Sequence, residues 1–207
     1  MKKVIKYLRK KYIKFLEKKI KIHNFFEKYL FKGKLKLGNK TRFYQPLILM
    51  GGGTIIIGNY CSFGYEYGGG FKNNYLEFQT RDNNAIIEIG NNVATNNNLF
   101  LCTRNHIVIK DDVLIGRNVT IMDHNAHGVL PTERRTSAGT ARKIIIEENV
   151  WLGNYVTILP GTIIGKNSIV GAGSVVKGIF PENVIIQGNP AKIIKKIELG
   201  DKDGKEI

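Results

Sequence analysis

From Ile146 to Val176 the chain carries an aliphatic side chain at every sixth position. These residues are Ile146, Leu152, Ile158, Ile164, Val170 and Val176. Four positions after each of the first five comes a small or β-branched residue: Val150, Val156, Thr162, Ser168 and Ser174. A helix repeats near 3.6 residues and an open strand near two, so neither accounts for this pattern. A period of six predicts stacked parallel coils that bury their aliphatic residues inside.

The same frame continues upstream and is interrupted by a single loop, residues 124–143. It passes through Ile109, Val113, Ile115, Val119 and Ile121. A weaker version covers residues 57–62 and 89–94 and slips by two residues near Ile107. We therefore expect a basic helical extension over residues 1–36, one solenoid domain over 37–197 and a charged tail over 198–207.

The positive charge is concentrated in the extension. Residues 1–36 hold fourteen Lys or Arg against Glu17 and Glu27, which places +12 of the net +15 in that segment. Apolar residues recur there at roughly helical spacing: Ile5, Leu8, Tyr12, Phe15 or Leu16, Ile20, Phe25, Phe26, Tyr29 and Leu30. This pattern predicts one or two basic amphipathic helices.

Two roles for the extension stay open. An ordinary helix would pack its apolar stripe on the solenoid or on a neighbouring subunit. A basic amphipathic helix with aromatic residues also suits anionic lipid at the inner face of a membrane. Nucleic acid is not expected as a partner, because beyond residue 36 there is no basic stripe with interleaved aromatic residues.

The remaining composition favours a cytoplasmic protein, with peripheral membrane contact if the extension binds lipid. Cys61 and Cys102 lie far apart without a CxxC motif, which is typical of reduced core residues. Nothing approaches the roughly 18 consecutive apolar residues of a spanning helix, and no signal-peptide pattern follows the start.

The loop that interrupts the repeat is the best place to look for chemistry. It begins after Asp123 and contains two of the four histidines, His124 and His127. Long loops without structure of their own are uncommon in compact domains and tend to be functional. By residue type alone, His124 is as compatible with a solvated surface position as with a catalytic base.

Several motifs give the chain a family resemblance. They are Asp123-His124, the run Pro131-Thr132-Glu133-Arg134-Arg135, Val150-Trp151-Leu152-Gly153-Asn154, Ile158-Leu159-Pro160-Gly161, residues 170–176 (VGAGSVV) and Gly188-Asn189-Pro190-Ala191-Lys192. Together they resemble the hexapeptide-repeat acyltransferases, in particular the galactoside, maltose and capsule-sugar O-acetyltransferases. The resemblance implies a left-handed parallel β-helix, a homotrimer, and acetyl-CoA bound between neighbouring subunits without a required metal. Left-handed crossovers are rare among parallel strands, so this handedness depends on the resemblance.

The resemblance also implies individual roles. The family's catalytic histidine falls on His124, and acceptor-facing positions fall on Asn96 and Trp151. Cofactor-binding positions fall on Gly153, Asn154, Ala172, Lys177, Lys192 and Lys195. His127 is interpreted as a loop residue rather than the base. Arg104 stands where some sugar-specific members carry an acid, so the acceptor is not identified.

The expected mechanism follows from acetyl-CoA, whose thioester is already activated for acyl transfer. His124 would take the proton of a sugar hydroxyl as it attacks the acetyl carbonyl, without a covalent acyl-enzyme. A backbone N–H near Gly153 or Asn154 would support the oxyanion. Asp123, adjacent in sequence, would ordinarily point away from His124, so a backbone carbonyl is at least equally suited to orient the ring.

Three functions stay open at this point. The first is acetyl-CoA-dependent O-acetylation of a carbohydrate hydroxyl, for instance on a bacterial surface polysaccharide or its precursor. The second is N-acetylation of a nucleotide-linked amino sugar. The third is a solenoid without transferase activity, either a zinc carbonic anhydrase-like trimer or a scaffold. Zinc would need converging histidines, and the sequence offers only His124 and His127 in one loop with His106 some distance away.

Overall fold

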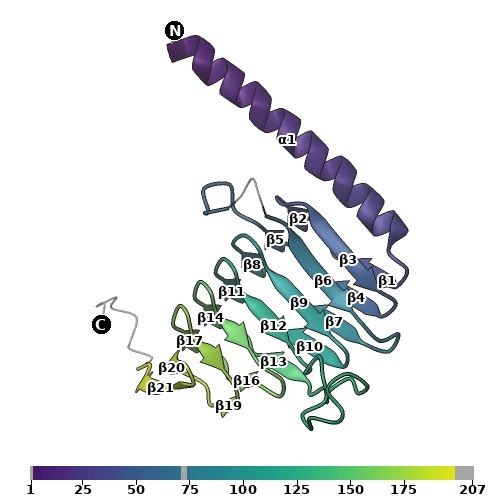
Figure 1. Ribbon diagram of the computed structural model, residues 1–207. Coiled ribbons are helices and arrows are strands. Elements are labelled where there is room, and N and C mark those ends of the chain that lie inside the picture. Colours follow the sequence, from purple (N-terminus) through teal and green to yellow (C-terminus); the bar gives the residue numbers. More distant parts are fainter. Residues whose placement is uncertain (1, 71–73, 199–207) are drawn as a thin grey trace.

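The protein is described by a computed structural model that covers residues 2–70 and 74–198. Only Glu198 of the expected tail falls within it. One long helix, α1 (Lys2–Leu30), precedes a stack of short strands, as Figure 1 shows. The extension therefore forms a single helix.

The strands form three sheets. Sheet A contains β1 (Lys34–Leu37), β4 (Thr54–Ile57), β7 (Ile86–Ile89), β10 (His106–Ile109), β13 (Ile144–Ile146), β16 (Ile163–Ile164) and β19 (Ile179–Phe180). Sheet B contains β2 (Arg42–Phe43), β5 (Ser62–Phe63), β8 (Ala94–Thr95), β11 (Leu114–Ile115), β14 (Trp151–Leu152), β17 (Ile169–Val170), β20 (Val184–Gly188) and β21 (Ala191–Lys196). Sheet C contains β3 (Leu47–Gly51), β6 (Leu76–Thr80), β9 (Phe100–Thr103), β12 (Thr120–Met122), β15 (Thr157–Ile158) and β18 (Val175–Val176).

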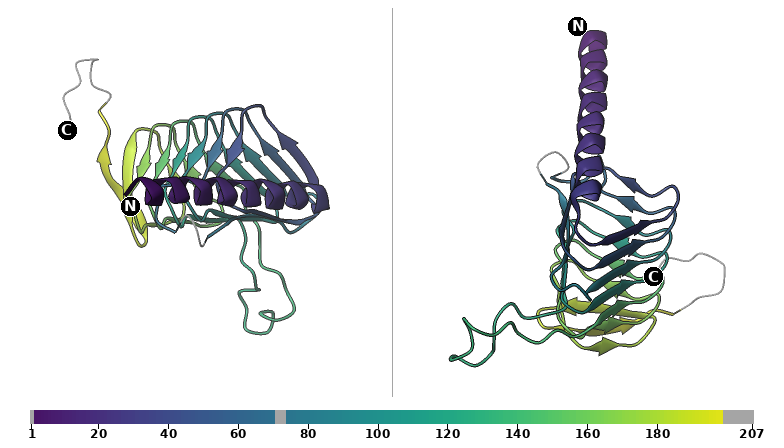
Figure 2. Two further views of the ribbon diagram at one scale, coloured as in Figure 1. Left: turned by 90° about the horizontal axis from the view of Figure 1, so that it is seen from above. Right: turned by 90° about the vertical axis from the view of Figure 1, so that its right-hand side faces the viewer.

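Each complete coil contributes one strand to each sheet in the order A, B, C. Each strand therefore pairs in parallel with the strand three positions earlier in the chain. Six complete coils, and a seventh that has only β19 and β20, build a parallel β-helix. Figure 2 shows the coils stacked along one axis. The last strand, β21, departs from this rule because it runs antiparallel to β20. The first strand begins at Lys34, so residues 34–36 belong to the first coil.

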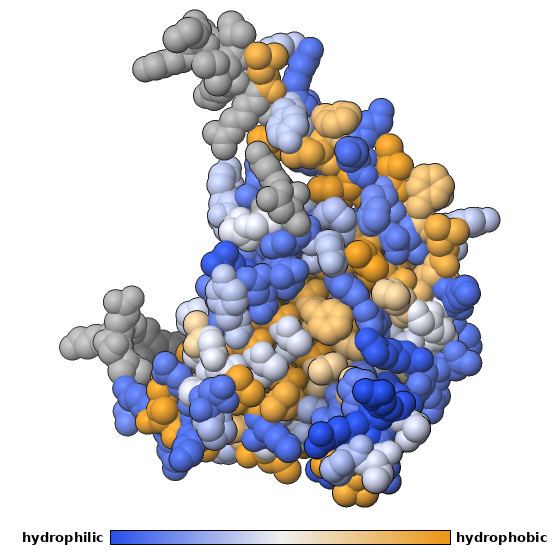
Figure 3. Space-filling model, viewed as in Figure 1, coloured by the Kyte–Doolittle hydropathy of each residue, from blue (hydrophilic) through white to orange (hydrophobic). Residues whose placement is uncertain are grey.

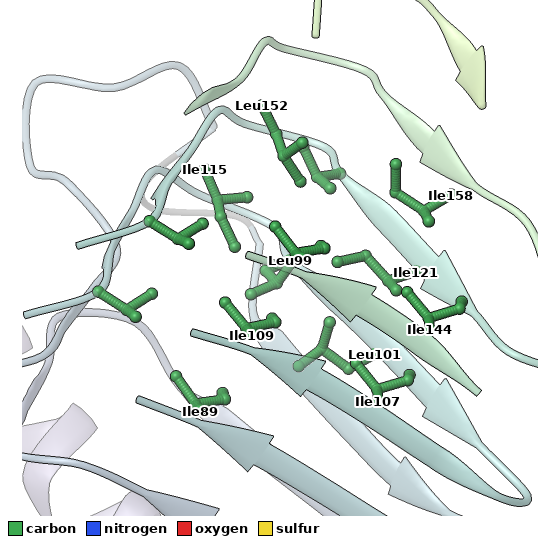
Figure 4. Packing of buried hydrophobic residues seen from close by; sticks show 14 of the residues in the cluster. Ile89, Leu99, Leu101, Ile107, Ile109, Ile115, Ile121, Ile144, Leu152 and Ile158 are labelled. Carbon is green, nitrogen blue, oxygen red and sulfur yellow. The ribbon is translucent and has the colours of Figure 1, made fainter. Parts of the chain in front are cut away.

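The six-residue repeat forms the core. All six aliphatic residues of the repeat from Ile146 to Val176 are fully buried, and their five companion residues are buried with them. Figure 4 shows Ile115, Leu152 and Ile158 among the side chains that fill the interior of the coils. Burying each such side chain contributes about 1.5–3 kcal/mol. The solenoid predicted from the period is confirmed.

Left-handed backbone conformations turn the chain at the corners. Every corner between sheets A and B has one residue with φ between 55° and 61°: Lys40, Tyr60, Asn92, Asp112, Asn149, Asn167 and Asn183. Asn and Asp tolerate this conformation better than other non-glycine residues. At the last three corners the side chains of Asn149, Asn167 and Asn183 are also linked by hydrogen bonds of 3.0 and 2.8 Å. The asparagines between the aliphatic positions therefore set the corner geometry.

The C-terminal turns of α1 dock on β3, which has no strand on its outer side. Asn24 is buried, and its Oδ1 accepts a hydrogen bond from Leu47 N at 2.7 Å. Glu27 Oε2 accepts one from Leu49 N at 3.1 Å, and His23 Nε2 lies 3.1 Å from Leu47 O. The rest of the helix rises away from the solenoid (Figure 2).

Candidate active site

The loop of residues 124–143 leaves the solenoid at the corner between sheets C and A and projects from it (Figure 2). Its two ends are held together at the base. His124 pairs antiparallel with Ala141, and Arg142 N donates to Asp123 O at 2.7 Å. These two contacts fix the backbone on both sides of His124, which is the first residue of the loop.

His124 is buried, with only 1% of its surface exposed. Its Nδ1 lies 3.0 Å from Asp123 Oδ1. The expectation that Asp123 would point away from the ring is therefore wrong. Side chains alternate only along a regular strand, and β12 ends at Met122, so the chain bends where these two residues meet.

Asp123 is itself held from several sides. The backbone N–H groups of Arg104, Asn105 and His106 donate to its carboxylate at 2.9 Å each. The hydroxyl of Thr103 donates to Oδ2 as well. An ionised carboxylate can only accept hydrogen bonds, so it is a suitable acceptor for all four of these donors. The N–H at Nδ1 of His124 is a fifth donor to the same carboxylate. Thr103 is a functional candidate that none of the motifs contains, and Asp123 belongs to a motif that does not by itself give it a role.

The other ring nitrogen, Nε2 of His124, is buried and has no hydrogen-bond partner among the described residues. With the proton on Nδ1 facing Asp123, the neutral ring carries its lone pair on Nε2. Buried polar atoms are nearly always satisfied, and an exception calls for a functional explanation. A lone pair held in a fixed direction is suited to accept a proton from a molecule that enters from outside the chain.

Two other histidines have their own partners. His127 Nδ1 lies 2.8 Å from Arg134 O inside the exposed loop, which agrees with a role in loop packing. His106 Nε2 lies 3.2 Å from Glu88 Oε2 on sheet A. Within the described ranges, no group of three or more His, Cys, Asp or Glu side chains is placed to hold a metal ion.

A shallow groove of about 380 Å³ lies along sheet B, and the predicted acceptor residues line it. Asn96 and Trp151 meet there with Asn154, Leu114 and Tyr65. Trp151 pairs with Leu114 in register across β14 and β11, and the two side chains are 52% and 50% exposed. Such exposed apolar surface suits either a channel wall or a subunit interface.

The predicted cofactor residues Gly153, Asn154 and Ala172 lie together at the corner between sheets B and C. A Cβ added to Gly153 would come within 2.7 Å of Ala172 N in the next coil, so only glycine fits this approach. Gly153 N already donates to Val170 O at 2.8 Å, which removes it as an oxyanion donor. Asn154 Oδ1 accepts a hydrogen bond from Arg117 N at 2.9 Å. Of the two suggested oxyanion donors, the backbone N–H of Asn154 is the one left.

One chain does not bring the predicted set together. His124 lies at the corner between sheets C and A, and in a three-sided coil that corner is opposite sheet B, where Asn96 and Trp151 line the groove. Lys177 follows β18 and so shares the corner of His124 two coils further on. Lys192 and Lys195 are exposed on β21.

Arg104 secures the base of the loop. Its Nε lies 3.1 Å from Asp82 Oδ2, and its Nη1 donates to Gly139 O at 3.5 Å. The resemblance places an acid of some sugar-specific proteins at position 104. This chain has a cation there instead, and its contacts join the loop to the preceding coil.

The fold and the six-residue repeat are similar to those of hexapeptide-repeat proteins, and comparisons with known proteins agree. Residues 143–178 match the family described as "Bacterial transferase hexapeptide (six repeats)". A protein of Escherichia coli K12 named "Putative lipopolysaccharide biosynthesis O-acetyl transferase WbbJ" is 43% identical over 123 residues, covering 54% of this chain and 61% of that protein. The galactoside O-acetyltransferase of Lactococcus lactis is 43% identical over 115 residues, covering 56% of this chain and 55% of that protein.

Among solved structures, a galactoside acetyltransferase in complex with coenzyme A superposes with a TM-score of 0.55 at 29% identity, covering 78% of this chain and 64% of the other. The resemblance to the hexapeptide-repeat acyltransferases and the left-handed parallel β-helix are thus confirmed. The chain spans 55–61% of the length of the two curated relatives. None of its described helical residues forms a segment long and apolar enough to cross a bilayer.

Proposed function

We propose that this protein is an acetyl-CoA-dependent O-acetyltransferase that acts on a carbohydrate hydroxyl. The observation that carries the proposal is His124, with Nδ1 fixed by Asp123 and Nε2 buried without a partner among the described residues. The O-acetyltransferase names of the two curated relatives support the choice of reaction. The name of the Escherichia coli relative supports a bacterial surface glycan or its precursor as the acceptor.

In the proposed reaction, His124 Nε2 accepts the proton of the acceptor hydroxyl while the hydroxyl oxygen bonds to the acetyl carbonyl carbon. The tetrahedral intermediate then breaks the carbon–sulfur bond, and the coenzyme A sulfur leaves with the proton from His124. Asp123 stabilises the imidazolium that forms between the two steps. The Asn154 N–H is the proposed oxyanion donor, and one such donor is worth roughly 10²–10³ in turnover.

We propose that the site forms between subunits of a homotrimer. His124 and the sheet B groove lie on opposite sides of one chain, so the loop corner of one subunit must meet the groove of the next. A contact between two different surfaces closes into a ring when the rotation between subunits fits. The choice of three copies comes from the resemblance to the hexapeptide-repeat acyltransferases. Exposed Val129 and Leu130 at the loop tip and the exposed Trp151 supply apolar surface for this contact.

The reaction is tested by mixing the protein with acetyl-CoA and a panel of hydroxyl and amino sugars and measuring the release of the coenzyme A thiol. Release with hydroxyl acceptors, together with a higher melting temperature in acetyl-CoA, is the expected result. Release only with amino sugars would replace the proposal with N-acetylation. No release and no thermal shift would overturn it.

The shared site is tested by co-expressing His124→Ala and Trp151→Ala chains, each of which is first measured alone and should have lost most of its activity. Random mixing places a wild-type His124 beside a neighbour's wild-type Trp151 at about one interface in four, so that share of the activity should return. The matched control combines His124→Ala with Asp123→Asn, both on the same side of the contact, and should recover nothing. If the first pair recovers nothing either, the shared site is wrong while the reaction itself can still hold.

A further inference from the structure

Helix α1 presents two faces that differ in what they contact. The face toward the solenoid carries Asn24 and Glu27, which accept hydrogen bonds from backbone N–H groups of β3. Leu16 and Ile20 are half-buried beside them. Roughly a third of a turn around the helix axis from that face lie the apolar side chains Leu8, Phe15, Ile22 and Phe26. They are between 49% and 59% exposed. At 100° per residue these four fall within one narrow stripe along the helix.

A band of lysines flanks this outward apolar stripe. Lys11, Lys14, Lys18 and Lys21 are exposed along one side of it. Only two acids are present among the described side chains of α1: Glu17, and Glu27, whose carboxylate already accepts from Leu49 N. Figure 3 shows both hydrophobic and hydrophilic side chains along the helix. The first turn also has no acidic residue to oppose the helix dipole.

This charge pattern distinguishes between two partners that could cover the apolar stripe, a second copy of the chain and an anionic surface. Leu8, Phe15, Ile22 and Tyr29 are spaced by seven, as in a coiled coil with a second copy. Apposed copies, however, would bring the lysine bands together with no acid except Glu17 to pair with them, and like charges at such positions are destabilising. An anionic surface matches the lysines instead and takes up the apolar residues as well.

We propose that the outward face of α1 is a docking surface for anionic phospholipid, with Leu8, Phe15, Ile22 and Phe26 entering the headgroup region and the lysine band contacting lipid phosphates. Basic amphipathic helices bind in this way, lying in the plane of the interface. The C-terminal turns stay on β3 and fix the helix to the solenoid. The surface shares no residue with the candidate active site, so it is testable without reference to the reaction.

The experiment is vesicle flotation of the full-length protein with equimolar phosphatidylcholine and phosphatidylglycerol, and with phosphatidylcholine alone. We expect flotation with the anionic vesicles at low salt, loss of flotation at high salt, and none with neutral vesicles, because screening weakens the attraction. In one variant Lys14, Lys18 and Lys21 are replaced by Gln. Each lysine near the surface contributes about fivefold, so the partition coefficient should fall about a hundredfold.

A second variant, Leu8→Gln with Phe15→Gln, removes apolar side chains and should lower the partition coefficient by at least about tenfold. The matched control is Ile179→Gln, which changes an aliphatic side chain that is 77% exposed at the far end of the solenoid and should leave flotation unchanged. Circular dichroism and light scattering confirm helix content and particle mass for each variant. Indifference of the full-length protein to both vesicles would overturn the proposal, as would flotation that survives both variants. A drop in particle mass without a change in flotation would assign the stripe to a second copy and also overturn it.

Discussion

Asp123 and His124 are consecutive residues whose side chains turn toward each other, with Oδ1 of the carboxylate 3.0 Å from Nδ1 of the ring. Both are almost fully buried at the point where the chain leaves β12. Neighbours in a strand cannot make this contact, so it depends on the bend at the start of the loop. The carboxylate is fixed by the coil below, and the ring is fixed by the carboxylate.

Replacing His124 by Ala should lower turnover by roughly a hundred- to ten-thousand-fold, because the reaction loses its general base. The thermal shift in acetyl-CoA should persist, since the fold and the cosubstrate groove are untouched. His127→Ala is the control and should lose far less, because that ring bonds only within the loop. A His124→Ala enzyme of normal activity would remove the base assignment.

Asp123→Asn should lower kcat with little change in the KM for acetyl-CoA, because the amide no longer fixes the ring N–H. It should also cost about 1–3 kcal/mol of unfolding free energy, since an amide nitrogen then faces backbone donors. Thr103→Val is the matched control: it removes one donor to the same carboxylate without touching the ring. Equal kcat losses in the two variants would show that Asp123 acts through stability alone.

Asn24→Ala should reduce the free energy of unfolding by about 1–3 kcal/mol, because Leu47 N–H would remain buried without its acceptor. Urea titration followed by circular dichroism measures this change. Lys14→Ala, on the exposed side of the same helix, should have almost no effect. Equal effects would mean that the helix does not depend on this contact with β3.

Both cysteines should resist thiol reagents in the folded protein. Burial raises the pKa of the Cys61 thiol and of the Cys102 thiol, so little thiolate is present near pH 8. Cys61 Sγ also lies 3.1 Å from Gly90 O, and Cys102 Sγ lies 3.4 Å from Gln79 Oε1. A colorimetric thiol assay should give a signal only after denaturant is added, and rapid labelling of the native protein would contradict the packing.

The solenoid is predictable from the sequence because the six-residue period follows directly from which side chains are buried in each coil. Residues such as Leu152 and Ile158 must point inward once the coils stack, and they do. The docking of α1 could not be predicted in the same way. Hydrophobic spacing detects apolar faces, whereas this contact uses the polar side chains of Asn24 and Glu27 on backbone groups of β3.

The candidate site was predictable residue by residue but not in its arrangement. Asn96 and Trp151 were expected to act with His124, and the fold places them on the opposite side of the same chain. No pattern along one chain can show which surface of a second copy completes a site. The contact between Asp123 and the ring is not predictable for a local reason: alternation along a strand would turn Asp123 away from His124, but β12 ends at Met122 and the chain bends there.

The last strand has a consequence for the length of the particle. Each end of a stacked parallel solenoid offers backbone groups on which another molecule could continue the ladder, which is the route to fibres. At β20 the chain blocks this growth with its own antiparallel β21 and the exposed Lys192, Lys195 and Lys196. At β3 the polar side chains of α1 accept hydrogen bonds from the backbone N–H groups of Leu47 and Leu49 instead. The chain thus closes the C-terminal end of sheet B and the N-terminal end of sheet C with its own segments, although a six-residue repeat has no inherent end.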